Sequence, residues 1–420
     1  MTRTADAPTT PQDAAERRRG LVLVAVAIVL TAANLRTAVT SVGPVLEEVE
    51  AGLGVSSAAA GVLTTMPVVC FAAIGFAGPS LAARFRDAHV LAGALLTMAA
   101  GLVLRAVVDA FPVFLAGTAL AMVGGALGNV LLPGLVKRWF PERTGLLVGA
   151  YSASMAVGGA VAAVSTAPIA AAVGPGGWRW ALGIWAGLAL VAALPWFLAP
   201  RSPGASRGTH RAVRMAPLAR SPLALTLAVF FGLQAMQAYV VMGWSAQYLR
   251  DAGLSAATAG LLLGVNSIVV IPVNAVVPSL TVRQRWQRPL LLGFMACYVV
   301  GWTGMWLAPT TLPWLWMGVM AVGMGTFSMV LALLGLRART PETVAALSTF
   351  TQGWGYVLAG TGPLLVGVLR GVTGGYTGMF VLVAVSTVGL TVTGWLATRD
   401  RFVDDEVAGW APVSAASPRG

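Results

Sequence analysis

Long apolar runs, separated by short polar segments, dominate this chain. Runs such as LVLVAVAIVL and LAGALLTMAAGLVL are continuously apolar and lack the alternation over about ten residues that is typical of membrane-spanning β-strands. A helix needs about 20 apolar residues to cross a bilayer core. The pattern therefore predicts twelve transmembrane helices, over residues 21–44, 57–80, 88–108, 112–136, 144–172, 178–199, 223–247, 256–280, 289–308, 312–336, 343–369 and 376–397.

The composition also indicates a membrane protein. Of the 420 residues, 57% are hydrophobic and 10% are charged, and the mean hydropathy is +0.80. In soluble domains, about a quarter of the residues are usually charged. We therefore predict an all-α membrane protein whose main partner is the lipid bilayer.

The basic residues are unevenly distributed among the predicted loops. If the N-terminus is cytoplasmic, 22 of the 27 Lys and Arg residues lie on cytoplasmic segments and four lie at the outer side, Arg105, Arg179, Arg250 and Arg370. This is the positive-inside distribution of multi-pass proteins. It predicts a protein of the cytoplasmic (inner) membrane with both termini cytoplasmic. It also explains the net charge of +12, so we expect no nucleic-acid partner.

A polar segment divides the spans into six and six. The stretch RSPGASRGTHRAVRMAPLARSP, at 201–222, is rich in Pro, Gly, Ser and Arg, which is typical of a linker. A weak repeat supports the division, because AGLGVSSAAAGVLTTMPVV (51–69) resembles AGLSAATAGLLLGVNSIVV (252–270) and GLVKRWFPER (134–143) resembles GLRARTPET (335–343). Paired halves of this kind are a transporter design with the solute site between them. The predicted order is a cytoplasmic tail (1–20), a six-helix bundle (21–200), a cytoplasmic linker (201–222), a second six-helix bundle (223–398) and a cytoplasmic tail (399–420).

Few residues offer catalytic or metal chemistry. The acidic residues fall in tails, loops or helix ends, and His89 and His210 lie on the predicted cytoplasmic side. Cys70 and Cys297 lie in spans without the spacing of a disulfide framework or metal site. We therefore expect no catalytic residues, no metal, no cofactor and no enzymatic activity. Because no acid is available for a proton relay, facilitated or potential-driven transport is favoured.

One cation lies inside a predicted span. Arg36, in TAANLRTAVT, falls about four residues past the middle of the first run, roughly 6 Å toward the outside. A charge at the centre of a membrane helix costs about 2.5–3.5 kcal/mol. Arg36 either snorkels to the headgroups or faces a cavity as an anion site, because guanidinium offers a planar fork of donors. We favour the anion site, since intramembrane charges usually face a cavity.

The internal repeat adds a second candidate. Moving Arg36 by the repeat offset of about two hundred residues leads to Gln237, in GLQAMQAYVVMGW of the seventh span. The two residues would then face each other across the cavity. Gln234 lies three residues before Gln237 and is expected on the same helix face. Paired glutamines also hold membrane helices together, so both interpretations stay open.

Further candidates lie in the eleventh and fifth spans. Gln352 and Tyr356, in FTQGWGYVLAG, are four residues apart and can line one helix face. Tyr151 and Ser154 are their counterparts in the fifth span. Ordinary helix packing is the alternative for the aromatic residues, and it is the favoured interpretation for Trp354.

Four asparagines in the spans are interpreted as structural or left open. Asn34 lies about 200° around the helix from Arg36, so the two do not share a face and Asn34 is expected to be structural. Asn129, Asn266 and Asn274 can satisfy neighbouring helices rather than a ligand.

Five motifs along the chain together form a recognisable pattern: ANLRTAVTSVGPVL, GVLTTMPVVC, GNVLLPGLVKRWFPER, YLRDAGLSAATAGLLLG and LGLRARTPETVAALSTFTQGWGYVLAGTGPLL. Through these motifs the chain resembles the major facilitator superfamily and, within it, the cyanate and nitroimidazole (CynX/NimT-like) transporter family. The resemblance covers nearly all twelve spans. One departure is PSLAARFR, where Ala83 stands in place of the acid of the superfamily signature G-x-L-a-D-r-x-G-R.

The resemblance implies two pseudo-symmetric bundles and secondary transport by alternating access. The implied solute is small and anionic or nitrogen-rich, similar to cyanate or nitroimidazole, and we expect a monomer. The alternative is a multidrug or metabolite efflux transporter of the same fold. A cationic drug would meet Arg36 with no acid to bind it, so the anionic solute is favoured.

Overall fold

The computed structural model describes residues 11–84, 87–200 and 217–407. Residues 1–10 of the predicted N-terminal tail, 201–216 of the predicted linker and 408–420 of the predicted C-terminal tail lie outside the described residues. Ala83 belongs to a stretch, 75–87, whose side chains are not described.

The described chain is helical, as the apolar runs predict. Twelve helical segments are long and apolar enough to cross a membrane, which confirms the predicted fold class. The first half contains α1 (Pro11–Asn34), α2 (Thr37–Thr40), α3 (Leu46–Leu53), α4 (Ser57–Arg84), α5 (Asp87–Val107), α6 (Phe111–Trp139), α7 (Thr144–Val173), α8 (Gly177–Gly183) and α9 (Trp185–Leu198). The second half contains α10 (Pro222–Asp251), α11 (Ala256–Thr281), α12 (Gln284–Leu307), α13 (Pro313–Gly323), α14 (Thr326–Leu336), α15 (Pro341–Thr373), α16 (Thr377–Ala397) and α17 (Val403–Glu406).

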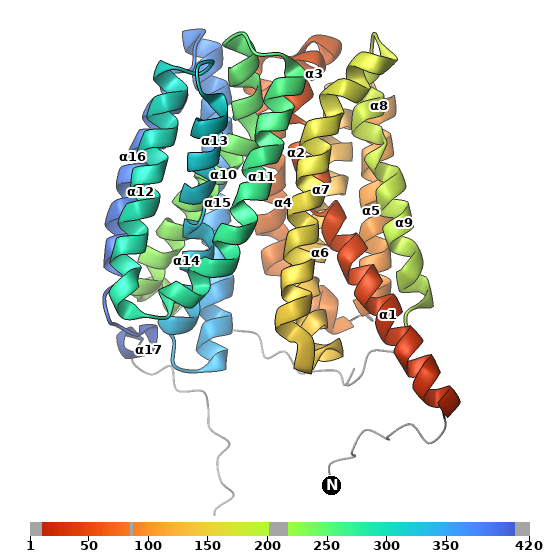
Figure 1. The fold of residues 1–420 in the computed structure, drawn as a ribbon, viewed down its shortest axis with the longest axis vertical. Helices are drawn as coiled ribbons and strands as arrows, with labels where there is room; N and C mark the ends of the chain where they lie inside the picture. Colours follow the sequence, from red (N-terminus) through yellow and green to blue (C-terminus); the bar gives the residue numbers. More distant parts are fainter. Residues whose placement is uncertain (1–10, 85–86, 201–216, 408–420) are drawn as a thin grey trace, which may run out of the picture.

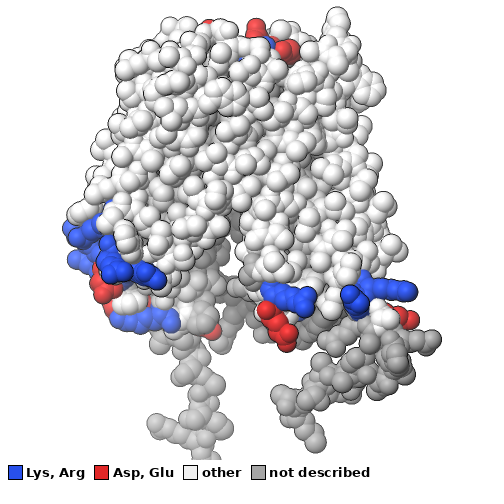
Figure 2. Space-filling model, in the orientation of Figure 1, with Lys and Arg blue, Asp and Glu red and all other residues white. Residues whose placement is uncertain are grey.

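The two halves stand side by side with their helices roughly parallel (Figure 1). The face at which α1 begins and α17 lies is called the terminal face, and the opposite face, which carries α3, the α3 face. Charged side chains gather at these two faces and leave an uncharged band between them (Figure 2). This distribution is the one expected of a protein that crosses a bilayer.

The halves meet closely along α4 with α15 and α7 with α11. Glycines permit this approach. A Cβ at Gly61 would lie 3.1 Å from the Cα of Gly367, and a Cβ at Gly260 would lie 2.4 Å from the carbonyl oxygen of Ala163. Small residues at helix contacts let membrane helices pack by van der Waals contact. These contacts lie toward the α3 face, so they close the space between the halves on that side.

Three spans are interrupted where the sequence predicts continuous helices. The first run, predicted as one helix over 21–44, is broken between α1 and α2; the sixth is broken at Ile184 and the tenth at Met324 and Gly325. Near the first break, the Asn34 side-chain amide donates to the carbonyl of Leu30 at 2.8 Å and to that of Leu188 at 3.4 Å. A polar side chain that bonds to the backbone competes with the helix ladder, and this competition is not visible in the apolar pattern. The structural interpretation of Asn34 is confirmed.

Candidate solute site

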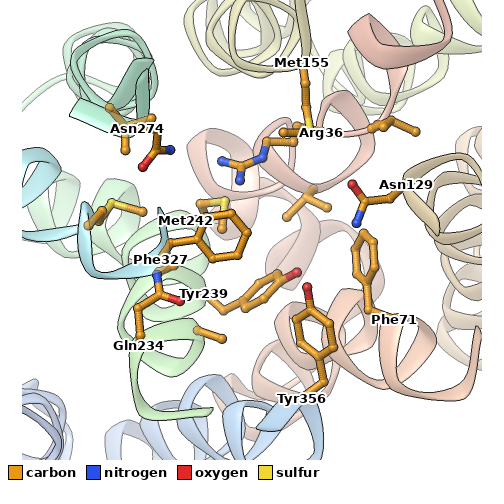
Figure 3. Close-up of a pocket in the computed structure, with 16 residues that line it drawn as sticks. Arg36, Phe71, Asn129, Met155, Gln234, Tyr239, Met242, Asn274, Phe327 and Tyr356 are labelled. Atoms are coloured by element: carbon orange, nitrogen blue, oxygen red, sulfur yellow. The ribbon is translucent and has the colours of Figure 1, made fainter. Parts of the chain in front are cut away.

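A cavity lies between the two halves, beside the break in the first span (Figure 3). The empty space between its walls is about 790 Å³ when the part open to solvent is included. The first half contributes Leu35, Arg36, Val39, Phe71, Asn129 and Met155, and the second half contributes Gln234, Ala235, Ala238, Tyr239, Met242, Val270, Asn274, Met324, Phe327 and Tyr356. Both halves thus form the wall, as expected of a site at the interface of repeats.

Arg36 supplies the one formal charge among the residues that line this cavity. It is half-buried and lies in the break, directly before α2. Its guanidinium forms no hydrogen bond or ion pair with any described residue, and its side chain extends into the cavity in Figure 3. A partly desolvated cation with free donors in a fixed fork is suited to binding a carboxylate or another planar anion.

The backbone around Arg36 is held firmly in the first half. The amide and the hydroxyl of Thr40 both donate to the Arg36 carbonyl, at 2.9 and 3.0 Å, and the hydroxyl also contacts the carbonyl of Gly159 at 2.8 Å. A Cβ at Gly159 would lie 3.1 Å from the Cβ of Arg36, and one at Gly158 would lie 1.9 Å from the carbonyl oxygen of Ala33. The glycine pair therefore lets α7 press directly against the break.

A second arginine supports the same break from behind. Arg105, on α5, is 0% exposed, although the sequence places it near the outer side. Its guanidinium donates to the carbonyls of Ala38 and Leu182 and to the hydroxyl of Ser41, at 3.2–3.3 Å. These acceptors lie at the interruptions of the first and sixth spans, where carbonyls lose helical donors. Arg105 therefore ties the two interruptions together.

The remaining polar wall is formed by neutral donors and acceptors. The side chains of Asn129, Tyr239 and Tyr356 form no hydrogen bond with the described residues, and Figure 3 shows the two tyrosine hydroxyls directed toward the cavity. Asn274 accepts a hydrogen bond from Ser328 at 2.8 Å. Acidic residues do not occur among the described residues of this wall, so the electrostatics favour an anion over a cation.

Aromatic rings from both halves form another part of the wall. Phe71 of α4 stacks on Tyr356 of α15, with ring centroids 5.7 Å apart and an angle of 30° between the planes. Phe231, which is fully buried behind this wall, packs edge-on against Tyr356 with ring centroids 5.1 Å apart. Such rings offer flat surfaces for a planar solute.

Three of the seven residues predicted as site residues line the cavity: Arg36, Gln234 and Tyr356. The expectation that Gln237 faces Arg36 is wrong. Gln237 is 0% exposed; its amide donates to Ser386, Thr387 and the carbonyl of Val383, and its oxygen accepts from Trp302. The repeat offset assumes two continuous helices, whereas Arg36 lies at a break and α10 is unbroken.

The other predicted residues do not reach the cavity wall. Ser154 donates to the carbonyl of Val29 at 2.8 Å, Tyr151 packs against the apolar cluster of the first half, and Gln352 is half-buried outside the lining. Trp354 is 56% exposed on the outside of the helix bundle. A position close to Tyr356 in the sequence therefore does not predict that a side chain faces the cavity.

Several lining residues were missed or interpreted differently. The sequence leaves helix packing open as the role of Asn129 and Asn274, whereas both line the cavity. Asn266 donates to the carbonyl of Met317, as such packing predicts. Tyr239 lies in the same quoted segment as Gln234, yet a tyrosine in a membrane helix gives no distinct signal. Phe71 is part of an apolar run, so only its three-dimensional position identifies it.

On the α3 face, ion pairs join the halves. Arg250 of α10 contacts both carboxylate oxygens of Glu48, at 2.7 and 2.9 Å, and Glu47 at 2.8 Å. Arg370 of α15 contacts Glu50 at 3.4 Å and Asp251 at 2.9 Å. Because the three glutamates belong to the first half and both arginines to the second, these contacts hold the two halves together at the α3 face. The hollow between the halves is visible on the terminal side in Figure 2.

Tyr376, in the loop before α16, completes this group. Its hydroxyl donates to Asp251 at 2.7 Å. Burial, together with this hydrogen bond, raises the pKa of Tyr376 above its ordinary value. The hydroxyl therefore stays protonated at neutral pH and remains a donor.

Comparisons with known proteins agree with this architecture. The family model described as Major Facilitator Superfamily matches residues 24–363. An uncharacterized transporter of Bacillus subtilis, YycB, is 34% identical over 378 residues, covering 90% of this chain and 93% of the relative. The 2-nitroimidazole transporter of Escherichia coli is 33% identical, covering 91% and 97%. The cyanate transport protein CynX of the same organism is 30% identical, covering 87% and 94%.

The fold is similar to that of solved transporters. A bacterial homologue of the human lysosomal transporter Spinster, in an inward-facing and occupied conformation, superposes with a TM-score of 0.72 at 18% identity. The match covers 94% of this chain and 99% of the other. At this identity the likeness concerns the fold alone.

Proposed function

We propose that this chain, which belongs to the major facilitator superfamily and within it to the cyanate and nitroimidazole transporter family, is a secondary transporter whose solute is a small anion. The solute binds between the halves, with its negative group on Arg36. The chain is not an enzyme. Its relatives are transporters of the same fold.

The unpaired guanidinium of Arg36 carries this proposal. An intramembrane charge costs several kcal/mol on most scales, yet Arg36 has no acidic partner and no hydrogen bond among the described residues. A snorkelling side chain would extend toward a headgroup region, whereas Arg36 lines the cavity between the halves. Binding of an anion would supply the missing counter-charge. The aromatic wall and the neutral amides favour a planar, conjugated or nitrogen-rich solute over a bulky aliphatic one.

The orientation follows from the basic residues. We place the terminal face in the cytoplasm of a cell whose inner membrane holds the protein, because most Lys and Arg residues lie on that side. The ion pairs of the α3 face then close the outside, and the cavity opens inward. A cysteine at Ser206 in the linker should react with an impermeant reagent only after the cells are permeabilised; labelling in intact cells would reverse this orientation.

Transport by the purified full-length protein in proteoliposomes tests the proposal. Suitable probes are cyanate, 2-nitroimidazole, and the pair benzoate and benzamide, which have similar shapes and differ in charge. We expect benzoate to exchange and benzamide to exchange much more slowly. With no acid in the described cavity wall, benzoate movement should also follow an imposed membrane potential rather than a pH gradient.

Transport of benzamide or of an organic cation at the same rate as benzoate would contradict the anion proposal and favour the efflux of neutral or cationic compounds. Empty liposomes are the control for passive diffusion. Export and import are measured separately, because direction is set by the gradients.

A further inference from the structure

Gln234 is the most deeply buried polar residue of the cavity wall that lacks a partner. It is 2% exposed and lines the cavity from α10. Neither its amide nitrogen nor its oxygen forms a hydrogen bond with a described residue, and the oxygen Oε1 is completely buried. A buried carboxamide without partners is unfavourable in a folded protein.

The neighbouring glutamine shows that packing does not require this arrangement. Gln237, one helical turn later on α10, is equally buried, and its carboxamide is fully satisfied by Ser386, Thr387, Val383 and Trp302. On the same helix, therefore, Gln237 forms hydrogen bonds within the protein, whereas Gln234, at the cavity, forms none with the described residues.

From this contrast we propose that Gln234 is a specificity-determining residue that binds a hydrogen-bond donor of the solute, an N–H or O–H group, through Oε1. The inference rests on the proposed function, because it assumes that Arg36 binds the negative group of the same solute. The substrate class is then narrower than small anions. It consists of small planar anions that carry a donor group away from the negative charge.

The positions of the two residues give this second contact a role in transport. Arg36 belongs to the first half and is fixed to α7 through Thr40 and Gly159, whereas Gln234 belongs to the second half. A solute that binds both residues links the halves, while an anion without the donor contacts only Arg36. Differential binding of this kind is what allows a ligand to shift a conformational equilibrium. Donor-bearing anions should therefore bind more tightly and be exchanged faster.

The test uses matched pairs of probes in binding and exchange assays on the full-length protein. The pairs are 2-, 3- and 4-hydroxybenzoate, each against the fluorobenzoate substituted at the same ring position, since fluorine is similar in size and cannot donate. We expect the wild-type protein to bind at least one hydroxybenzoate about tenfold more tightly than its fluoro partner, the order expected for one hydrogen bond to a group that is otherwise unpaired.

Two variants assign this preference to Gln234. Gln234→Met keeps the length of the side chain and removes both polar atoms, so the hydroxybenzoate should lose its advantage and bind no more tightly than its fluoro partner. Gln352→Met is the matched control, because Gln352 lies outside the cavity, and it should retain the full preference. Arg36→Gln should weaken both members of each pair.

The outcomes separate the two proposals. Equal binding of both members of all three pairs, with binding that still depends on Arg36, would overturn the role of Gln234 and leave the anion transporter intact. A preference that persists in Gln234→Met would overturn it as well. If none of the benzoates binds the wild-type protein while cyanate does, this inference fails and the anion transporter stands; if cyanate and the benzoates all fail to bind, the proposed function fails and this inference fails with it.

Discussion

At the scale of residues, the direction in which a side chain points decides its role more than its chemical type does. The sequence draws attention to Arg36, Gln234 and Gln237 by their polarity inside apolar runs, and two of the three line the cavity. Gln237 does not, because three residues along a helix change the facing by about 60°, enough to direct it toward α16 and α12. A polar residue in a span is a candidate for solute binding, but only the packing of the helices shows whether it lines the cavity or contacts another helix.

A prediction at this scale concerns Gly159, which permits α7 to contact Arg36. A Cβ there would lie 3.1 Å from the Cβ of Arg36, so Gly159→Ala should displace the arginine without removing its charge. We expect a several-fold loss of anion affinity at normal protein abundance, measured by binding to the purified protein. Gly149→Ala is the control on the same helix, since nothing lies within 4 Å of its added Cβ; it should leave affinity unchanged and stabilise the helix by about 0.5–1 kcal/mol. Equal affinities in both variants would show that Arg36 tolerates the contact.

At the scale of elements, the sequence predicted every span and missed their interruptions. Apolar runs register the length that crosses the bilayer, and all twelve appear in the structure. At the breaks of the first and sixth spans, hydrogen bonds join segments that are far apart in the sequence, such as those from Asn34 to Leu188 and from Arg105 to Ala38 and Leu182. Such tertiary effects leave no periodicity in a single run.

We expect the ion pairs of the α3 face to influence the balance between a state open to the terminal face and a state open to the α3 face. Arg250→Gln should weaken that face, because Arg250 connects α10 to Glu47 and Glu48 of the first half. Partly exposed pairs contribute about 1 kcal/mol or less, which corresponds to roughly a fivefold shift in population. The shift is measured as the rate at which an impermeant thiol reagent, added from the α3 side, labels a cysteine at Thr64, a buried residue that contacts Gly243 across the halves.

Arg179→Gln provides the matched control for this measurement. It removes an arginine of the same face, but its ion pair with Asp109 lies within the first half. An increase in labelling that is as large in Arg179→Gln as in Arg250→Gln would attribute the effect to general loosening. If labelling increases in neither variant, the ion pairs do not control access to Thr64 from the α3 side.

At the scale of the whole molecule, the fold follows from composition, run length and the internal repeat, since a bilayer admits few architectures. The site follows only in part. The repeat indicated where the halves meet and Arg36 indicated the charge, but the wall of Phe71, Asn129, Tyr239 and Phe327 is assembled from four helices in both halves. None of these residues gives a distinct signal in its own segment, and only the packing of the helices brings them together around the cavity.

The most direct test of the central claim measures the affinity of one transported anion for the wild-type protein, Arg36→Lys and Arg36→Gln, each purified and checked for folding by thermal unfolding. A charge-assisted hydrogen bond contributes about 1.5–3 kcal/mol, so Arg36→Gln should bind roughly 10- to 150-fold more weakly while unfolding at the same temperature or higher. Arg36→Lys keeps the charge and loses the fork, so an intermediate affinity is expected. Unchanged affinity and transport rate in a well-folded Arg36→Gln protein would contradict the account and identify Arg36 as a residue that merely tolerates its position in the membrane.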